Sequence, residues 1–256
     1  MTAASRQEMI QACLAFPAAY EDYPFSDANW TVMRHRGNQK AFALLFERDG
    51  CLWMNLKCDP MRGEFLRETF AAIRPAYHMN KTHWISLVLD GSLPEELVHD
   101  LLADSYTAIR PKRKMQMVQK QKKRWLELLL LADPDEDMLD KYLDTGELYL
   151  CTEGTLPVGV AVVAAEDVCE LKNLAVAEPF WHCGIGSEML AWLCRQYRTA
   201  YDVMRVGTSA AGRAFYEKNG FTYTHTVKDF FVTYYPEPIF ENGRQVRDMV
   251  YLAKKL

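Results

Sequence analysis

One short stretch constrains the fold of this chain more than any other, because it joins a buried strand, a glycine turn and a helix start. The strand-like segment Glu170-Leu-Lys-Asn-Leu-Ala-Val176 precedes the glycine loop Cys183-Gly-Ile-Gly-Ser187. Beyond the loop, apolar residues at helical spacing predict a helix: Met189, Leu190, Leu193 and Cys194. Glycines let the backbone approach a ligand closely, and the first N–H groups of a helix lack intrahelical partners. The pattern predicts a pocket for a phosphorylated ligand; a tight turn without a ligand is the alternative.

Two common phosphate-binding motifs are excluded by single residues. A dinucleotide-binding loop reads G-x-G-x-x-G, but Met189 takes the third glycine position, and no strand ending in an acid follows at the distance of the ribose-binding carboxylate. A P-loop needs a lysine between its last glycine and a serine or threonine, whereas Ser187 follows Gly186 directly. Coenzyme A, whose pyrophosphate can be held by backbone donors, is the common ligand that remains.

A second segment follows in a matching order. Val206-Gly-Thr-Ser209 leads into Gly212-Arg-Ala-Phe-Tyr-Glu-Lys-Asn-Gly-Phe221. Together with the strand and the glycine loop, this segment resembles the GNAT superfamily of acetyltransferases, and the resemblance covers most of residues 113–256. Three late segments resemble the C-terminal strands of bacterial members: Lys228–Phe231, Glu237–Phe240 and Asp248–Leu252.

This resemblance implies a GNAT fold, a mixed sheet flanked by helices, in which acetyl-CoA lies between two splayed parallel strands near 169–176 and 203–207. Backbone amides of the loop would bind the pyrophosphate, and backbone groups of the first strand would hold the pantetheine arm and polarise the acetyl oxygen. The implied cofactor-binding residues are Leu174, Ala175, Val176, His182, Cys183, Gly184, Ile185, Gly186, Ser187 and Ser209. Two positions depart from the family pattern, because Trp181 replaces the usual Gln or Arg and Ser209 replaces the usual Asn.

The resemblance also implies catalytic roles. Tyr216 matches the tyrosine that protonates the leaving thiolate in many relatives; packing of the helix on the sheet is its alternative role. Glu170 is a candidate general base, because an amine must lose a proton before it attacks; an exposed acid at a strand start is the other interpretation. Asn173 is a candidate for orienting the acceptor. Covalent catalysis by Cys183 is not favoured, because the adjacent His182 is poorly placed to activate it.

The first part of the chain follows a different pattern. A capped helix at 5–14 precedes strand-like runs at 31–36, 41–48 and 52–57, then a helix at 61–72, a strand at 84–89 and a helix at 94–109. This order predicts an α+β unit. Its segments Tyr20–Phe25, Asn55–Pro60 and Tyr77–Trp84 resemble the MmcQ/YjbR family, which implies a CyaY-like α/β sandwich with an antiparallel sheet. We therefore expect a two-domain α+β protein, with an MmcQ/YjbR-like domain at 1–112 and a GNAT domain at 113–256.

Charge and composition limit the partners. The net charge is −4, and residues 1–112 carry 12 basic against 14 acidic residues, so nucleic acid is a possible but not a favoured partner. A local basic patch remains an alternative, formed by Arg34, Arg36, Lys40, Lys57 and Lys81. The basic run 110–124 is interpreted as a linker or an exposed helix face, with an anionic partner site as the alternative. No apolar run is long enough to span a membrane.

The cysteines indicate the compartment. Their number is odd, seven, and they show no C-x-x-C spacing, so we expect reduced thiols, no metal site and a cytoplasmic protein. The N-terminus lacks the basic-then-apolar order of a signal peptide.

These observations favour one function and leave one alternative. We expect an acetyl-CoA-dependent N-acetyltransferase that acts on a primary amine, in a small molecule or a peptide, by direct attack in a ternary complex. The alternative is a non-catalytic module that senses acyl-CoA or binds nucleic acid or protein. The variable loops 132–145 and 232–243 are expected to shape the acceptor site, with Tyr234, Tyr235 and Glu237 as candidate lining residues. The sequence does not specify the acceptor or the oligomeric state.

Overall fold

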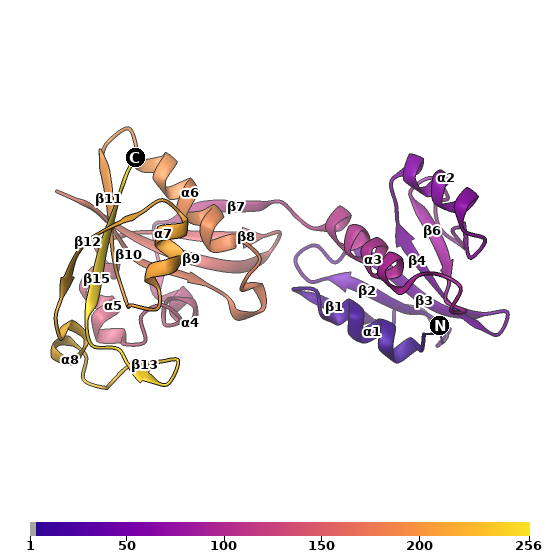
Figure 1. Cartoon of the computed structure of the whole chain (residues 1–256), viewed down its shortest axis with the longest axis horizontal. Coiled ribbons are helices and arrows are strands. Elements are labelled where there is room, and N and C mark those ends of the chain that lie inside the picture. The colour runs from indigo at the N-terminus through magenta and orange to yellow at the C-terminus, as the bar shows by residue number, and fades with distance from the viewer. Residues whose placement is uncertain (1–3) are drawn as a thin grey trace. The chain divides into compact units, whose positions relative to one another are not determined.

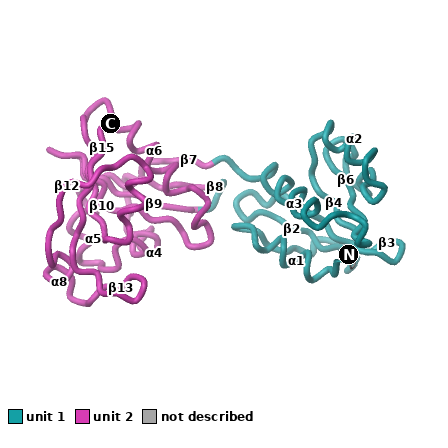
Figure 2. The backbone as a smooth tube through the Cα atoms, in the orientation of Figure 1, with its two compact units in different colours: residues 1–112, 153–156 teal, residues 113–152, 157–256 magenta. Residues whose placement is uncertain are grey.

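The computed structural model describes residues 4–256, which form two compact units (Figure 2). The first unit contains the residues up to Lys112 together with 153–156, and the second contains 113–152 and 157–256. The turn 153–156 joins two strands of the second unit's sheet, yet it packs with the first unit, where the buried carboxylate of Glu153 pairs with His35 at 3.0 Å and with Arg110 at 2.8 Å.

The first unit is an antiparallel sheet with helices packed on it (Figure 1). Its elements are α1 (Arg6–Leu14), β1 (Ala19–Asp22), β2 (Thr31–His35), β3 (Ala41–Arg48), β4 (Cys51–Lys57), α2 (Pro60–Thr69), β5 (Ile73–Pro75), β6 (Trp84–Val88) and α3 (Glu95–Ile109). The strand order is β1-β2-β3-β4-β6-β5. Ser5 and Glu8 form the capping box that starts α1, as the sequence predicts. Residues from α1, α3 and the sheet share one hydrophobic core.

The second unit is a mixed seven-stranded sheet flanked by helices (Figure 1). Its elements are β7 (Arg113–Val118), η1 (Lys122–Trp125), α4 (Leu126–Leu129), α5 (Glu136–Leu143), β8 (Glu147–Glu153), β9 (Leu156–Ala165), β10 (Cys169–Val176), η2 (Glu178–Phe180), α6 (Ile185–Tyr197), β11 (Val203–Thr208), α7 (Arg213–Lys218), β12 (Thr222–Val227), α8 (Phe230–Tyr234), β13 (Phe240–Glu241), β14 (Arg244–Gln245) and β15 (Met249–Lys255). The sheet order is β12-β15-β11-β10-β9-β8-β7, with β10 and β11 parallel. The predicted two-domain α+β class is confirmed.

Three local predictions differ from the structure. The basic run 110–124, expected as a linker or a helix face, contains β7, an edge strand. Edge strands commonly carry lysine and arginine, because these charges discourage pairing with another chain. The segment Lys228–Phe231, expected as a strand, is a turn that leads into α8. The short strands β1 and β5 were not predicted, since each has only a few residues and no clear alternation.

Several basic side chains in 110–124 have partners within the folded chain. Lys123 bridges Glu136 at 3.0 Å and Asp140 at 2.8 Å, and Lys122 donates to three carbonyl oxygens at the end of α5 and in the turn that follows. Arg113 pairs with Glu188. In the first unit, Arg34 is paired with Asp22 at 2.7 Å. These partners remove much of the free positive charge that nucleic-acid binding requires.

Within residues 4–256, no helix combines the length and apolarity needed to cross a membrane.

The helices beside β10 depend on a small buried cluster. Leu139 of α5 is fully buried among Leu129, Leu143 and Val160. We expect Leu139→Ala to lower the free energy of unfolding of the second unit by about 3 kcal/mol, because truncation removes buried apolar area and leaves a cavity. Urea denaturation of the full chain measures this change. Leu131→Ala, at a leucine that is 44% exposed, is the matched control and is expected to cost less than about 1 kcal/mol.

Candidate functional site

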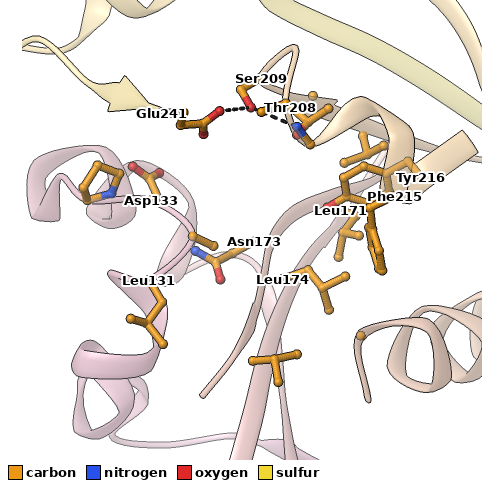
Figure 3. A pocket seen from close by; sticks show the side chains of 18 of the residues that line it. Leu131, Asp133, Leu171, Asn173, Leu174, Thr208, Ser209, Phe215, Tyr216 and Glu241 are labelled. Carbon is orange, nitrogen blue, oxygen red and sulfur yellow. Dashed lines mark hydrogen bonds between the residues drawn. The ribbon is translucent and has the colours of Figure 1, made fainter. Parts of the chain in front are cut away.

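A cleft of about 1080 Å³ opens in the second unit where two parallel strands separate. β10 and β11 are paired only through Cys169, Glu170 and Leu171, opposite Met204, Arg205 and Val206. Beyond that point the strands no longer pair, and both line the cleft together with α7, the start of α6, the segment 130–134 and the chain after α8 (Figure 3). The separation leaves backbone groups of both strands free to bind a ligand.

The start of α6 presents free backbone donors to this cleft. The first helical hydrogen bond runs from the N–H of Glu188 to the carbonyl of Gly184 at 3.0 Å. Among residues 4–256, the N–H groups of Gly184, Ile185, Gly186 and Ser187 have no protein acceptor. Gly184 has φ +77°, a conformation that favours glycine, and open space surrounds the position of its missing Cβ. The loop therefore offers converging donors at the positive end of a helix dipole.

The free edge of β10 also faces the gap. The N–H of Ala177 donates to the carbonyl of Val158 on β9 at 3.0 Å. Because backbone groups alternate along a strand, those of Ala175 face β9 as well, whereas those of Leu174 and Val176 face the gap. The carbonyl of Val176 accepts a hydrogen bond from the indole N–H of Trp181 at 2.7 Å. Trp181, which departs from the family pattern, therefore occupies the carbonyl of Val176. The backbone of Leu174 remains free to bind a ligand.

Tyr216 lies in the cleft on α7, next to Phe215 and Leu171 (Figure 3). Its side chain is 9% exposed, and burial, with no contribution from a hydrogen bond, is what perturbs its hydroxyl. Burial raises the pKa of Tyr216 well above its usual value of about 10. The phenol therefore stays protonated at neutral pH and is able to donate its proton.

Ser209 lines the cleft just before α7 and is held by hydrogen bonds to its neighbours. Its hydroxyl donates to Oε2 of Glu241 at 2.6 Å and accepts from the N–H of Gly212 at 3.2 Å. Figure 3 shows this bridge between the Glu241 strand and the turn before α7. The side chain of Ser209 thus shapes the turn before α7 and brings a carboxylate to the cleft.

Asn173 is the centre of a buried polar chain. Its Nδ2 donates to the carbonyl of Leu129 at 3.0 Å and to the hydroxyl of Tyr142 at 3.2 Å. The Tyr142 hydroxyl donates to Oδ2 of Asp133 at 3.0 Å. Burial is the main cause that raises the pKa of Asp133, and the hydrogen bond from Tyr142 acts in the opposite direction. Tyr235 also interacts with this carboxyl.

The structure brings most of the predicted site residues into one cleft. The predicted residues that line it are Asn173, Leu174, Val176, His182, Gly184, Ile185, Gly186, Ser187, Ser209 and Tyr216. Three others do not line it: Glu170, Ala175 and Cys183. Glu170 lies on the part of β10 that is still paired with β11, and its carboxylate pairs with Lys172 at 2.8 Å. Of the three expected acceptor-loop residues, Tyr235 lines the cleft, whereas Tyr234 and Glu237 do not.

Sequence reasoning did not identify Asp133, Tyr142 and Glu241 as site residues. Asp133 follows the apolar run Leu128–Leu131 and precedes Pro134. An acid at the end of an apolar run has no feature in the sequence that distinguishes a site residue from a surface charge. The buried partner Tyr142 lies on α5, so only the folded chain reveals the pair.

Across residues 4–256, no group of His, Cys, Asp and Glu side chains has a metal-binding arrangement.

Two family models match this chain. The YjbR model matches residues 14–108, and the model of the acetyltransferase (GNAT) domain matches residues 144–223. The chain is 37% identical over 132 residues to the uncharacterized N-acetyltransferase YvbK of Bacillus subtilis, which covers 49% of this chain and 85% of YvbK. It is 32% identical over 99 residues to the uncharacterized protein YjbR of Escherichia coli, which covers 39% of this chain and 81% of YjbR.

This chain joins a YjbR domain to a GNAT acetyltransferase domain. A GNAT family acetyltransferase from Elizabethkingia anophelis, solved with acetyl-CoA bound, is similar in structure with a TM-score of 0.54 and 36% identity. That similarity covers 56% of this chain and 98% of the solved chain. The predictions of both families, of the fold and of an acetyltransferase are confirmed.

Proposed function

We propose that the GNAT domain transfers an acetyl group from acetyl-CoA to a primary amine by direct attack in a ternary complex. The observation that carries this proposal is the separation of β10 and β11 beside four free backbone N–H groups at the start of α6. A slot of this kind accommodates an extended arm along the strands and a diphosphate at the helix start. The residues present therefore fit acetyl-CoA, the cofactor of this acetyltransferase.

The two ends of the slot hold different parts of acetyl-CoA. The N–H groups of Ile185, Gly186 and Ser187 hold the diphosphate through backbone donors, which do not depend on side-chain identity. Acetyl-CoA supplies an acetyl group activated as a thioester. The backbone of Leu174, which faces the gap, orients the pantetheine arm, and its amide polarises the acetyl oxygen. A preorganised donor at that oxygen stabilises the charge that develops when the amine attacks.

Tyr216 supplies the proton for the departing sulfur. A thiol has a pKa near 8.5 and a phenol near 10, so a nearby phenol is a suitable donor. The buried position of Tyr216 keeps its hydroxyl protonated until it is needed. Cys183 does not line the cleft, which favours direct attack by the amine over a covalent acetyl-cysteine.

One assay tests this function on the full chain. We expect acetyl-CoA to release free thiol, measured with a thiol reagent, in the presence of at least one member of a panel of primary amines. Initial rates at varied concentrations of both substrates should give intersecting reciprocal plots, as a ternary complex requires. Parallel plots would indicate a covalent intermediate. Binding of acetyl-CoA without acetylation of any amine would favour the acyl-CoA-sensing alternative.

A further inference from the structure

The buried polar groups around Asn173 contain more hydrogen-bond acceptors than donors. Both protons of the Asn173 amide and the proton of the Tyr142 hydroxyl are used within the chain that ends at Oδ2 of Asp133. A carbonyl oxygen only accepts, so the bond to Leu129 fixes which end of the amide is nitrogen. Two acceptor oxygens, Oδ1 of Asp133 and Oδ1 of Asn173, accept no hydrogen bond of ordinary geometry from the described residues, although the Tyr235 side chain and the Asp135 backbone also interact with the Asp133 carboxyl.

Both unpartnered oxygens belong to deeply buried side chains that line the cleft. Asp133 is 8% exposed and Asn173 is 3% exposed. Figure 3 shows Asn173 pointing from β10 toward the segment that carries Asp133. Buried acceptors without donors are costly, and native structures seldom keep them without a role. The missing complement is a group that is rich in donors and has no acceptor.

We propose that Asp133 and Asn173 bind the primary ammonium group of the acceptor and that Asp133 removes its proton. This inference rests on the proposed N-acetyl transfer and names the residues that receive the acceptor amine at that site. An ammonium group carries three N–H donors, no acceptor and a positive charge, so it matches one carboxylate oxygen and one amide oxygen. A hydroxyl acceptor offers only one donor, and a carboxylate would be repelled by Asp133.

The proton transfer prepares the amine for attack. One N–H bond of the ammonium breaks, its electron pair stays on nitrogen as the attacking lone pair, and the proton moves to Oδ1 of Asp133. The titratable groups that face Asp133 are Tyr142 on α5, Tyr235 after α8 and Asp135 on the same loop. Burial raises the pKa of Asp133 above its usual value, which makes the carboxylate a stronger base. Glu170, which pairs with Lys172 and does not itself line the cleft, is a less suitable base.

Asp133→Asn in the full chain tests the proposal, with Asp137→Asn as the matched control. Asp137 is an exposed acid in the first turn of α5 that does not line the cleft. The probes are n-butylamine, 1,4-diaminobutane, lysine methyl ester and a tripeptide with a free N-terminus. We expect Asp133→Asn to leave the Kd for acetyl-CoA unchanged and to lower kcat/KM about 100-fold at pH 7, since a general base contributes about 10²–10⁴-fold. Asp137→Asn should stay within about threefold of the wild type.

The pH profile separates a base from a structural role. The wild-type kcat/KM should rise with pH until Asp133 is ionised and then level off. Without the base, the rate should follow the fraction of free amine and continue to rise about tenfold per pH unit toward the amine pKa near 10. A constant loss at every pH would indicate a structural role and overturn the proposal.

The remaining outcomes distinguish this inference from the proposed function. If the wild type acetylates amines and Asp133→Asn stays within threefold at every pH, only the inference fails. If the wild type binds acetyl-CoA but acetylates no amine, the proposed function fails and the inference with it. Asn173→Leu is the second variant, should Asp133→Asn not fold. It should weaken the binding of n-butylamine to the protein–CoA complex about tenfold in calorimetry without changing the shape of the pH profile, and unchanged binding would count against the site.

Discussion

Gly186→Asp is expected to weaken the binding of acetyl-CoA about 1000-fold, or about 4 kcal/mol, without unfolding the domain. The new carboxylate would sit at the second position of α6, beside the N–H groups that are free in the structure. It would compete for those donors and repel the diphosphate, and a pair of unit charges about 5 Å apart near a protein surface contributes about 3 kcal/mol. An acid in the first turn of a helix stabilises the helix, so thermal stability should be retained.

Gly186→Asn is the matched control because it has the shape of aspartate without its charge. A Cβ at this position would lie 3.2 Å from Cζ of Phe215, so both variants require the same small shift of that ring. We expect the asparagine variant to lose only about tenfold in affinity, and the difference from aspartate measures the electrostatic part. Isothermal titration calorimetry with CoA measures both affinities. Equal affinities for wild type, Asp and Asn variants would show that the loop does not hold the diphosphate.

The parts of the fold that the sequence predicted well carry strong local signals. Ser5 and Glu8 define the start of α1, and the glycine loop before α6 is visible as a pattern of residues. β7 was missed because its sequence, Arg113–Val118, begins with two charged residues inside a basic run and shows no sustained alternation, and only pairing with β8 makes it a strand. The assignment of 153–156 to the first unit depends on contacts far apart in sequence, such as that between Glu153 and His35.

In the functional site, too, the features with local sequence signals were predicted and those formed by tertiary contacts were not. The backbone donors of 184–187 follow from glycine positions and a helix start, so the sequence alone placed them. The polar chain from Asn173 through Tyr142 to Asp133 joins a strand, a helix and a loop, and no spacing in the sequence connects them. Glu170 shows the opposite case, because an acid at the start of the central strand looks available in the sequence, whereas the fold pairs it with Lys172. Contacts formed by tertiary packing are the part that residue patterns do not encode.

Tyr216→Phe is expected to lower kcat about 1000-fold, or about 4 kcal/mol in the activation barrier, while the Kd for acetyl-CoA stays within about twofold. The substitution removes only the hydroxyl, so the packing of the ring against Phe215 and Phe221 is kept. Because burial raises the pKa of Tyr216, its hydroxyl stays protonated through the usual assay range. The wild-type rate should therefore show no decline between pH 7 and pH 9 that is due to this residue.

Tyr223→Phe is the control for this variant, because Tyr223 is an exposed tyrosine outside the cleft, on β12. Its kcat should equal that of the wild type, and both variants should unfold within a few degrees of the wild type in a thermal scan. Steady-state kinetics with a saturating amine then isolate the proton-donor role. If Tyr216→Phe keeps the full kcat, the hydroxyl is dispensable and Tyr216 serves only to pack the helix. A loss of acetyl-CoA affinity in place of kcat would instead point to a binding role for the hydroxyl, because a proton donor acts only when the C–S bond breaks.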